Sequence, residues 1–267
     1  MEQKTSFDPS WINKVIDFEA SDTFPLKQWK IVDKLNEISV QNDEEDDGEE
    51  SGHAHMQAIA IFECVNHMDA CESAFMKIYM QIPYTGSDNS QPEDRAQQAL
   101  PKAEITEEMA LLALTKQGCK SISPVFNWKR EEQDESGPVP GGYLVYLVVA
   151  DLPGVRISRD DYWNLSRKQR DEVRDAFKVA YTDCLSCGII RTSGVLGTSL
   201  IWDKASKKMF IVGFRYSRAA TEKDVWGSHL WLAWGFGERR REVSNMPQPL
   251  PSDILEDGSI NEALWEL

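Results

Sequence analysis

Hydrophobic residues recur along this chain at two different periods, which predict strands in one part and helices in another. Segments 55–66 (HMQAIAIFECVN) and 72–83 (ESAFMKIYMQIP) have strand composition and are separated by the break HMDAC, which predicts an antiparallel hairpin. Segment 104–119 (EITEEMALLALTKQGC) has acids in its first turn and a glycine near its end, as is typical of a helix. Segment 123–154 predicts two further strands joined by a polar loop rich in proline and glycine.

The beginning of the chain predicts two short helices. Segment 6–20 opens with an Asp-Pro-Ser start signal, and segment 25–38 has apolar residues at helical spacing. The residues that carry this spacing are Leu26, Trp29, Val32 and Leu35. We therefore expect a helical extension before the first strands.

The second half of the chain predicts more helix than strand. Segment 160–188 reads as one long helix that ends at Gly188, and segment 224–243 as an apolar helix with a basic end. Two short strands are expected between them, at 199–203 and 209–214. The apolar residues along one face of the long helix are Val173, Phe177, Ala180, Tyr181 and Cys184.

The order of these elements predicts an α+β protein without internal repeats. Residues 1–40 form the N-terminal helical extension and residues 41–52 an acidic disordered loop. Residues 53–152 form a strand-rich part, and residues 153–267 a helical part.

Charge and cysteine content limit the possible partners and compartments. A formal net charge of -15 disfavours loose binding to polyanions such as DNA, but seven of the acids lie in the run Asp43–Glu50, so basic patches can exist elsewhere. We expect this run to be dispensable. Five cysteines and the absence of an N-terminal apolar segment predict a reduced, cytoplasmic protein without disulfides. No apolar run approaches the roughly 20 residues of a membrane helix.

Several segments between about Ala58 and Ala219 resemble the protein-kinase-like superfamily, and more closely a group of fungal kinase-like proteins of secondary metabolism. FMKIY resembles the strand with the phosphate-binding lysine, here Lys77, and EEMALLAL the helix with its partner glutamate, here Glu107. GGYLVYLVVADLPG resembles the strand and hinge between lobes, and AFKVAYTDCLSCGII the approach to the catalytic loop. The resemblance implies a two-lobed fold, with a small antiparallel-sheet N-lobe and a helical C-lobe.

The resemblance fails at the positions that carry phosphoryl transfer. Gly194 stands where active members have the catalytic Asp, Ser199 where they have a metal-binding Asn, and Gly213 where they have a metal-binding Asp. The glycine-rich phosphate loop is also missing, because FECVNHMDACES contains no glycine. Phosphoryl transfer depends on such metal ligands, so we expect no conventional kinase activity, no metal and no cofactor.

Some candidate site residues follow from the resemblance, and each also has an ordinary structural explanation. Lys77 and Glu107 would form a pair that orients a ligand carboxylate or phosphate, unless Lys77 is only a snorkelling lysine. Hydroxyl groups near the emptied catalytic loop are candidate nucleophiles, although such residues commonly cap and turn loops. These hydroxyls belong to Thr192, Ser193 and Ser199.

Arginines and acids near the same loop are candidate substrate-binding residues. Arg191 and Arg215 flank the emptied site and would favour anions or a stacked adenine, although surface salt bridges are an alternative role for each. Asp151 and Asp203 would suit a guanidinium, as would Glu107. The basic run Arg239, Arg240 and Arg241 is a candidate contact for an RNA backbone or a solvated helix end.

Cysteine and histidine residues offer only weak metal-site signals. Cys184 and Cys187 form one C-x-x-C pair on the face of the long helix, and without a second pair we expect core packing rather than metal or redox use. His53 and His55 lie in the acidic loop and are expected to be solvated.

Three classes of function remain open. The chain is similar in size and layout to fungal arginine-containing cyclodipeptide synthases, which implies an aminoacyltransferase that uses Arg-tRNA and a second aminoacyl-tRNA. The first alternative is a non-catalytic pseudokinase scaffold or kinetochore-type binding module, and the second is a residual small-molecule phosphotransferase. Acyl transfer needs a hydroxyl or general base, an oxyanion stabiliser and an acidic pocket for the guanidinium, and no metal.

Overall fold

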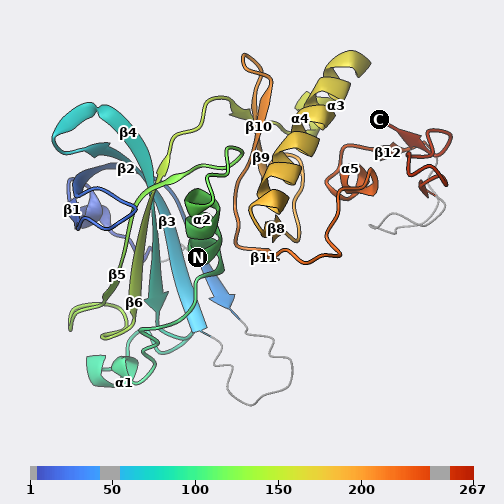
Figure 1. Cartoon of the computed structure of the whole chain (residues 1–267). Coiled ribbons are helices and arrows are strands. Elements are labelled where there is room, and N and C mark those ends of the chain that lie inside the picture. The colour runs from blue at the N-terminus through green and yellow to red at the C-terminus, as the bar shows by residue number, and fades with distance from the viewer. Residues whose placement is uncertain (1–4, 43–54, 241–252) are drawn as a thin grey trace. The chain divides into compact units, whose positions relative to one another are not determined.

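A computed structural model describes residues 5–42, 55–240 and 253–267 (Figure 1). The acidic run and His53 lie outside these residues, as does Arg241, whereas His55 begins the strand His55–Asn66. The chain divides into two compact units, which we call unit 1 (residues 1–104 and 125–151) and unit 2 (residues 105–124 and 152–267). Each unit is described by itself.

Unit 1 is built on one antiparallel sheet. Its strands are β1 (Val15–Phe18), β2 (Lys27–Asn42), β3 (His55–Asn66), β4 (Asp69–Ile82), β5 (Val125–Glu132) and β6 (Tyr143–Ala150). They form a six-stranded sheet in the order β1-β2-β3-β4-β6-β5. A 3-10 turn, η1 (Pro9–Trp11), and a short helix, α1 (Pro92–Ala96), complete the unit. The α+β class with an antiparallel N-terminal sheet is therefore confirmed.

The sheet pairs over long stretches and covers one apolar core. Met76 of β4 lies opposite Phe62 of β3 and opposite Val148 of β6. All three side chains are fully buried, as is Trp29 of β2, whose indole N–H donates to Asn127 Oδ1 at 2.9 Å. The predicted hairpin of β3 and β4 and the predicted strands β5 and β6 are confirmed.

The two predicted N-terminal helices are wrong. Segment 25–38 lies in β2, where Trp29 and Ile31 are buried, while Leu26, Val32 and Leu35 are exposed. Segment 6–20 contains only η1 and β1. Pairing of β2 with β1 and β3 outweighs the helical spacing, because the neighbouring strands provide hydrogen-bond partners for the backbone N–H and C=O groups of β2.

The described residues of unit 2 form four helices and several short strands. The helices are α2 (Thr106–Lys116), α3 (Arg159–Trp163), α4 (Arg167–Ser186) and α5 (His229–Ala233). The strands are β7 (Val155–Arg156), β8 (Ile189–Arg191), β9 (Leu200–Asp203), β10 (Lys208–Ile211), β11 (Ser217–Ala219), β12 (Glu238–Arg239) and β13 (Trp265–Glu266). They form the sheets β10-β9-β7, β11-β8 and β12-β13.

The long helix α4 is the main helix of unit 2. The single helix predicted over 160–188 is only partly present, because the chain forms α3 and α4 with a break at residues 164–166. Ser166 caps its N-terminus in a capping box with Gln169, and Gly188 follows its end with a left-handed φ of 82°. The residues predicted for its apolar face are all buried, and α4 packs against β8 and β10 (Figure 1). The predicted helix 104–119 and the strands at 199–203 and 209–214 are likewise present as α2, β9 and β10.

The predicted helical C-lobe is wrong, because the described part of the second half is rich in short strands. Segment 224–243 contains only the five residues of α5 before Gly235 takes a left-handed φ of 86°. Trp234 and Phe236 then pack on Phe177, with ring centroids at 4.8 and 4.9 Å. Burial of these rings and the glycine turn end the helix early.

Candidate functional site

Two positions that the kinase resemblance assigns to the metal ligands, Ser199 and Gly213, lie together in unit 2 because β9 and β10 form a hairpin. Leu200 lies opposite Ile211, so Ser199, just before β9, lies beside Val212, just after β10. The Val212 N–H donates to the Ser199 carbonyl at 2.9 Å. Gly213 is the next residue along the chain. Antiparallel pairing therefore brings Ser199 and Gly213 to the same end of this hairpin.

The guanidinium of Arg191 occupies the space between these residues. Arg191 is the last residue of β8; its Nε donates to the Gly213 carbonyl at 2.5 Å, and its Nη1 donates to Ser199 Oγ. Ser199 is fully buried, and Arg191 is half-buried. The guanidinium also lies 5.8 Å from the ring centroid of Trp234, within cation–π range. We call Arg191, Gly194, Ser199, Gly213 and Trp234 the arginine cluster.

Gly194 fits this cluster only because it lacks a side chain. A Cβ atom at this position would lie 2.4 Å from Trp234 Cζ3 and 2.5 Å from Arg191 Nη1. Gly213 has a left-handed φ of 74°, and a Cβ there would lie 3.5 Å from Arg191 Nη2. Gly194 therefore makes room for the arginine, whereas Gly213 is required by its backbone conformation, which an aspartate would adopt only with strain.

Glu107 lies near the cluster with the opposite charge. It lies in the first turn of α2, is only 6% exposed, and its Oε1 accepts from the Phe214 N–H at 3.3 Å. Burial lowers the pKa of Arg191, while the charge of Glu107 acts in the opposite direction. Glu107 therefore lies at the end of α2 where the helix dipole favours an acid.

The remaining predicted residues of unit 2 are placed around or away from the cluster. Thr192 Oγ1 donates to the Tyr216 carbonyl at 3.2 Å, Ser193 is exposed, and Arg215 is half-buried after Phe214. Asp203 lies at the opposite end of β9 from Ser199 and accepts from the Ala205 N–H at 3.0 Å in the following turn. The structure therefore brings together Arg191, Ser199 and Glu107 but not Asp203.

The predicted RNA-binding arginines have partners within unit 2. Arg239 Nη2 donates to Asp253 Oδ2 at 2.6 Å, and Asp253 is fully buried. Arg240 Nε donates to the carbonyls of Glu262 and Trp265 at 3.1 and 3.2 Å. A phosphate backbone would have to compete with these contacts. RNA binding by this run stays a prediction.

Two predicted site residues belong to unit 1. Lys77 lies on β4, half-buried, opposite Ile61 and Leu147. Asp151 is exposed and directly follows β6. The pair of Lys77 with Glu107 would join the two units, so it stays a prediction.

Unit 1 also contains a hollow of about 760 Å³ that sequence reasoning missed. Acidic side chains outnumber basic ones along it, and the aromatic rings of Trp11 and Tyr146 contribute to its wall. The acidic residues are Asp8, Asp88, Glu131, Glu132 and Asp134, and the basic ones are Lys14 and Arg95. The acidic segment 131–135 was the only available signal, and by sequence it reads as a loop.

The charged groups of the hollow are partly satisfied by their neighbours. Hydrogen bonds from Ser10 lower the pKa of Asp8, and hydrogen bonds from Ser136 lower that of Asp134. Arg95 Nε donates to the Pro138 carbonyl at 2.6 Å, and Lys129 forms an ion pair with Glu131 at 2.6 Å. These hydrogen bonds favour the charged forms of Asp8 and Asp134, so both carboxylates contribute negative charge to the hollow.

Two protein kinases of known structure are similar to this chain at low sequence identity. The kinase PK-1 of Cydia pomonella granulovirus matches with a TM-score of 0.39 and 13% identity, over 76% of this chain and 57% of that one. Vaccinia related kinase 3 matches with a TM-score of 0.38 and 10% identity, over 78% of this chain and 52% of that one. The chain thus spans little more than half the length of either protein. With both TM-scores below 0.5, these likenesses carry no argument about the site.

Comparison with protein-family models gives no match, and comparison with curated proteins gives none. Among the described residues, no helix combines the length and the apolar character that crossing a membrane requires.

Proposed function

We propose that this chain is a degenerate protein-kinase-like protein of pseudokinase type, a binding module that does not transfer phosphate. The observation that carries the proposal is the arginine cluster. Gly194, Ser199 and Gly213, which correspond by resemblance to the catalytic and metal-binding positions of active kinases, all lie around the guanidinium of Arg191.

The chemistry of the cluster is opposite to that of a magnesium site. Magnesium needs several oxygen ligands in octahedral geometry, whereas a guanidinium is a permanent cation that only donates hydrogen bonds. The Ser199 hydroxyl and the Gly213 carbonyl, which could offer oxygen atoms, already accept from Arg191. A metal cation at this place would be repelled by the positive charge of Arg191, so metal-dependent phosphoryl transfer is disfavoured.

The proposal predicts that magnesium and ATP do not stabilise the full chain together. If the dissociation constant is no lower than the ligand concentration, binding adds at most about 0.4 kcal/mol, which corresponds to a shift in Tm of less than about 2 °C. Thermal unfolding should be recorded with ATP alone, with magnesium alone and with both. A rise of several degrees that requires magnesium would contradict the proposal.

A second candidate, the arginine-containing cyclodipeptide synthase, draws support from the hollow of unit 1. A substrate guanidinium is bound by bidentate carboxylates and by stacking on aromatic rings. The hollow offers both, through Glu131 and Glu132 and through Trp11 and Tyr146. It is a different place from Asp151, which the sequence suggested for this role. In this candidate the partners are Arg-tRNA and a second aminoacyl-tRNA, and Thr192, Ser193 and Ser199 keep their predicted role as hydroxyl nucleophiles.

The second candidate predicts new arginine-containing diketopiperazines when the chain is expressed in a host, detected by mass spectrometry. A Glu131→Gln, Glu132→Gln double variant should lower their yield at least tenfold, because it removes the two carboxylates of the hollow that would bind the substrate guanidinium. Glu135→Gln is the matched control, since this exposed acid does not line the hollow. Absence of such products from a well-folded wild-type chain would exclude the synthase and leave the binding module.

A further inference from the structure

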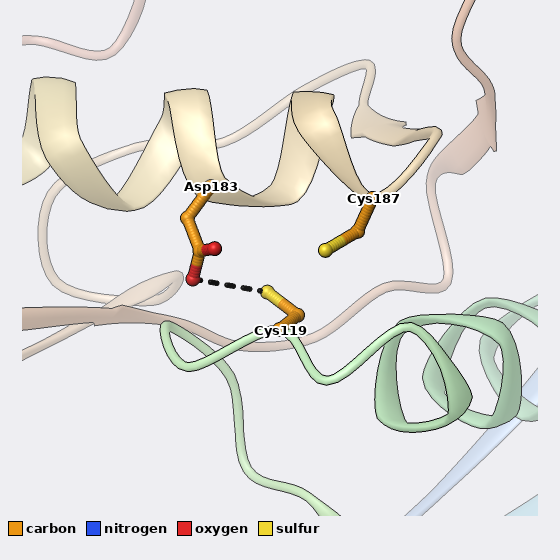
Figure 2. Close-up of side chains that lie close together, drawn as sticks. All are labelled: Cys119, Asp183 and Cys187. Carbon is orange, nitrogen blue, oxygen red and sulfur yellow. Dashed lines mark hydrogen bonds between the residues drawn. The ribbon is translucent and has the colours of Figure 1, made fainter.

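One cysteine that follows α2 lies in unit 2 beside two cysteines and an aspartate at the end of α4. Figure 2 shows the side chains of Asp183 and Cys187, at the end of α4, facing Cys119, which follows α2. The ligand atoms of these three residues all lie within 4.8 Å of one another. Cys184, also on α4, places its Sγ 3.8 Å from that of Cys119, although the two residues are 65 positions apart. We call these four residues the thiol cluster.

Helix geometry explains why α4 can present several donors to one point. Asp183 and Cys187 are four residues apart, and Cys184 and Cys187 are three apart, so the members of each pair lie on the same side of the helix. Cys119 is placed by the end of α2, where Gly118 has a left-handed φ of 74°. The C-x-x-C pair, which alone favoured core packing, thus acquires a third thiol and a carboxylate from the tertiary structure.

Two distances within the cluster match those of a tetrahedral zinc site. With Zn–S bonds of about 2.3 Å, two sulfur ligands lie about 3.8 Å apart, and a sulfur and an oxygen ligand about 3.5 Å apart. The Sγ atoms of Cys119 and Cys184 are 3.8 Å apart, and Cys119 Sγ lies 3.3 Å from Asp183 Oδ2. Cys184 Sγ is not among the donor atoms that all lie within 4.8 Å of one another, so its side chain must change rotamer to join the other three in coordination.

The surroundings of the cluster suit a cation. The cluster lies at the C-terminal end of α4, where the helix dipole is negative. The Lys120 N–H donates to Asp183 Oδ2 at 2.8 Å and orients the carboxylate, as groups around metal ligands commonly do.

We propose that Cys119, Asp183 and Cys187 bind one zinc ion, with Cys184 as the fourth ligand. Thiolates favour zinc over magnesium or calcium, and the four donors are the number that a closed structural site requires. Each coordinating thiol releases its proton to solvent as the metal binds. The ion holds the segment after α2 against α4 within unit 2, and it is independent of the arginine cluster and of the proposed function.

The full wild-type chain, purified with reductant, tests the site directly. We expect one zinc per chain by elemental analysis, a fall in Tm when a chelator removes it, and recovery of the Tm on adding zinc alone. Replacement of zinc by cobalt should produce a thiolate-to-cobalt charge-transfer absorption. Absence of this absorption together with absence of zinc binding in a competition titration would overturn the proposal, and neither result depends on a variant that must fold.

Variants then assign the ligands. Cys187→Ser and Asp183→Asn should weaken zinc binding at least about 100-fold, and Ser121→Ala, which removes a hydrogen bond to Asp183, about 10–100-fold. Cys71→Ser is the matched control, because Cys71 is an exposed cysteine of unit 1 outside the cluster. Equal affinity in Cys187→Ser and Cys71→Ser would refute the assignment. A Cys119–Cys184 disulfide, together with no zinc binding after that disulfide has been reduced, would show that the cluster is a redox pair instead.

Discussion

Replacing Gly194 with aspartate is expected to destabilise unit 2 by at least about 2 kcal/mol and to create no metal site, although it restores the acid of active kinases. The new Cβ would lie 2.4 Å from Trp234 Cζ3. That ring has little freedom to move, because it packs on Phe177 at 4.8 Å and on Tyr181 at 6.4 Å. The carboxylate would also have to be placed in a space already filled by Arg191.

Urea unfolding followed by tryptophan fluorescence measures this effect, with Ser193→Asp as the control. Ser193 is the exposed neighbour of Gly194, so Ser193→Asp adds the same charge without a clash. The free energy of unfolding of this variant should differ little from that of the wild type. A Gly194→Asp chain as stable as the wild type, with a Tm that rises on adding magnesium, would show that the space is available and that the arginine cluster has been misinterpreted.

Replacing Arg191 with methionine is expected to lower the free energy of unfolding by about 2–4 kcal/mol. Methionine keeps most of the apolar stem but removes the donors to the Gly213 carbonyl and to Ser199 Oγ. It also removes the positive charge near the buried Glu107. Arg191→Lys should recover only part of the loss, because one ammonium cannot reproduce the planar fork of the guanidinium.

The matched control is Arg218→Met. Arg218 is an exposed arginine of the neighbouring strand β11, where it forms an ion pair with Asp224 at 2.7 Å, and exposed pairs contribute little to stability. If Arg191→Met and Arg218→Met both unfold at the urea concentration of the wild type, then Arg191 does not stabilise the loop between β8 and β9. Its guanidinium would then be available to a ligand.

Local sequence patterns were sufficient to predict those elements in which residue composition, capping residues and apolar spacing all favour the conformation that the fold adopts. The hairpin of β3 and β4 combines strand composition with a polar break, and α4 has a capping box, an apolar face and a terminal glycine. The helix prediction for segment 25–38 was wrong. It relied on the helical spacing of four apolar residues, and only Trp29 is buried, while Leu26, Val32 and Leu35 are exposed. Sheet pairing decided the conformation there, and no local pattern reports which partner strand is present.

The candidate site was only partly predictable, for a similar reason. Arg191 and Ser199 could be named because they lie close together in sequence around the emptied loop. Trp234 could not, since it reaches the cluster only when the chain turns at Gly235 and its ring packs on Phe177. The hollow of unit 1 also escaped prediction, because its wall combines the N-terminal segment with the end of β5 and residues of α1.

The sequence by itself determined the α+β class, the strands β3 to β6 and the helices α2 and α4, because each of these depends on residue type or short-range periodicity. That Gly194 and Gly213 stand in place of acids follows from the resemblance alone and stays a prediction. Only the tertiary structure decided which residues lie around these two glycines. It placed Arg191 between Ser199 and Gly213, and it brought Cys119 to Cys184 and Cys187. The physical reason is that hairpin pairing and helix packing join residues far apart in the chain, whereas local patterns report only on near neighbours.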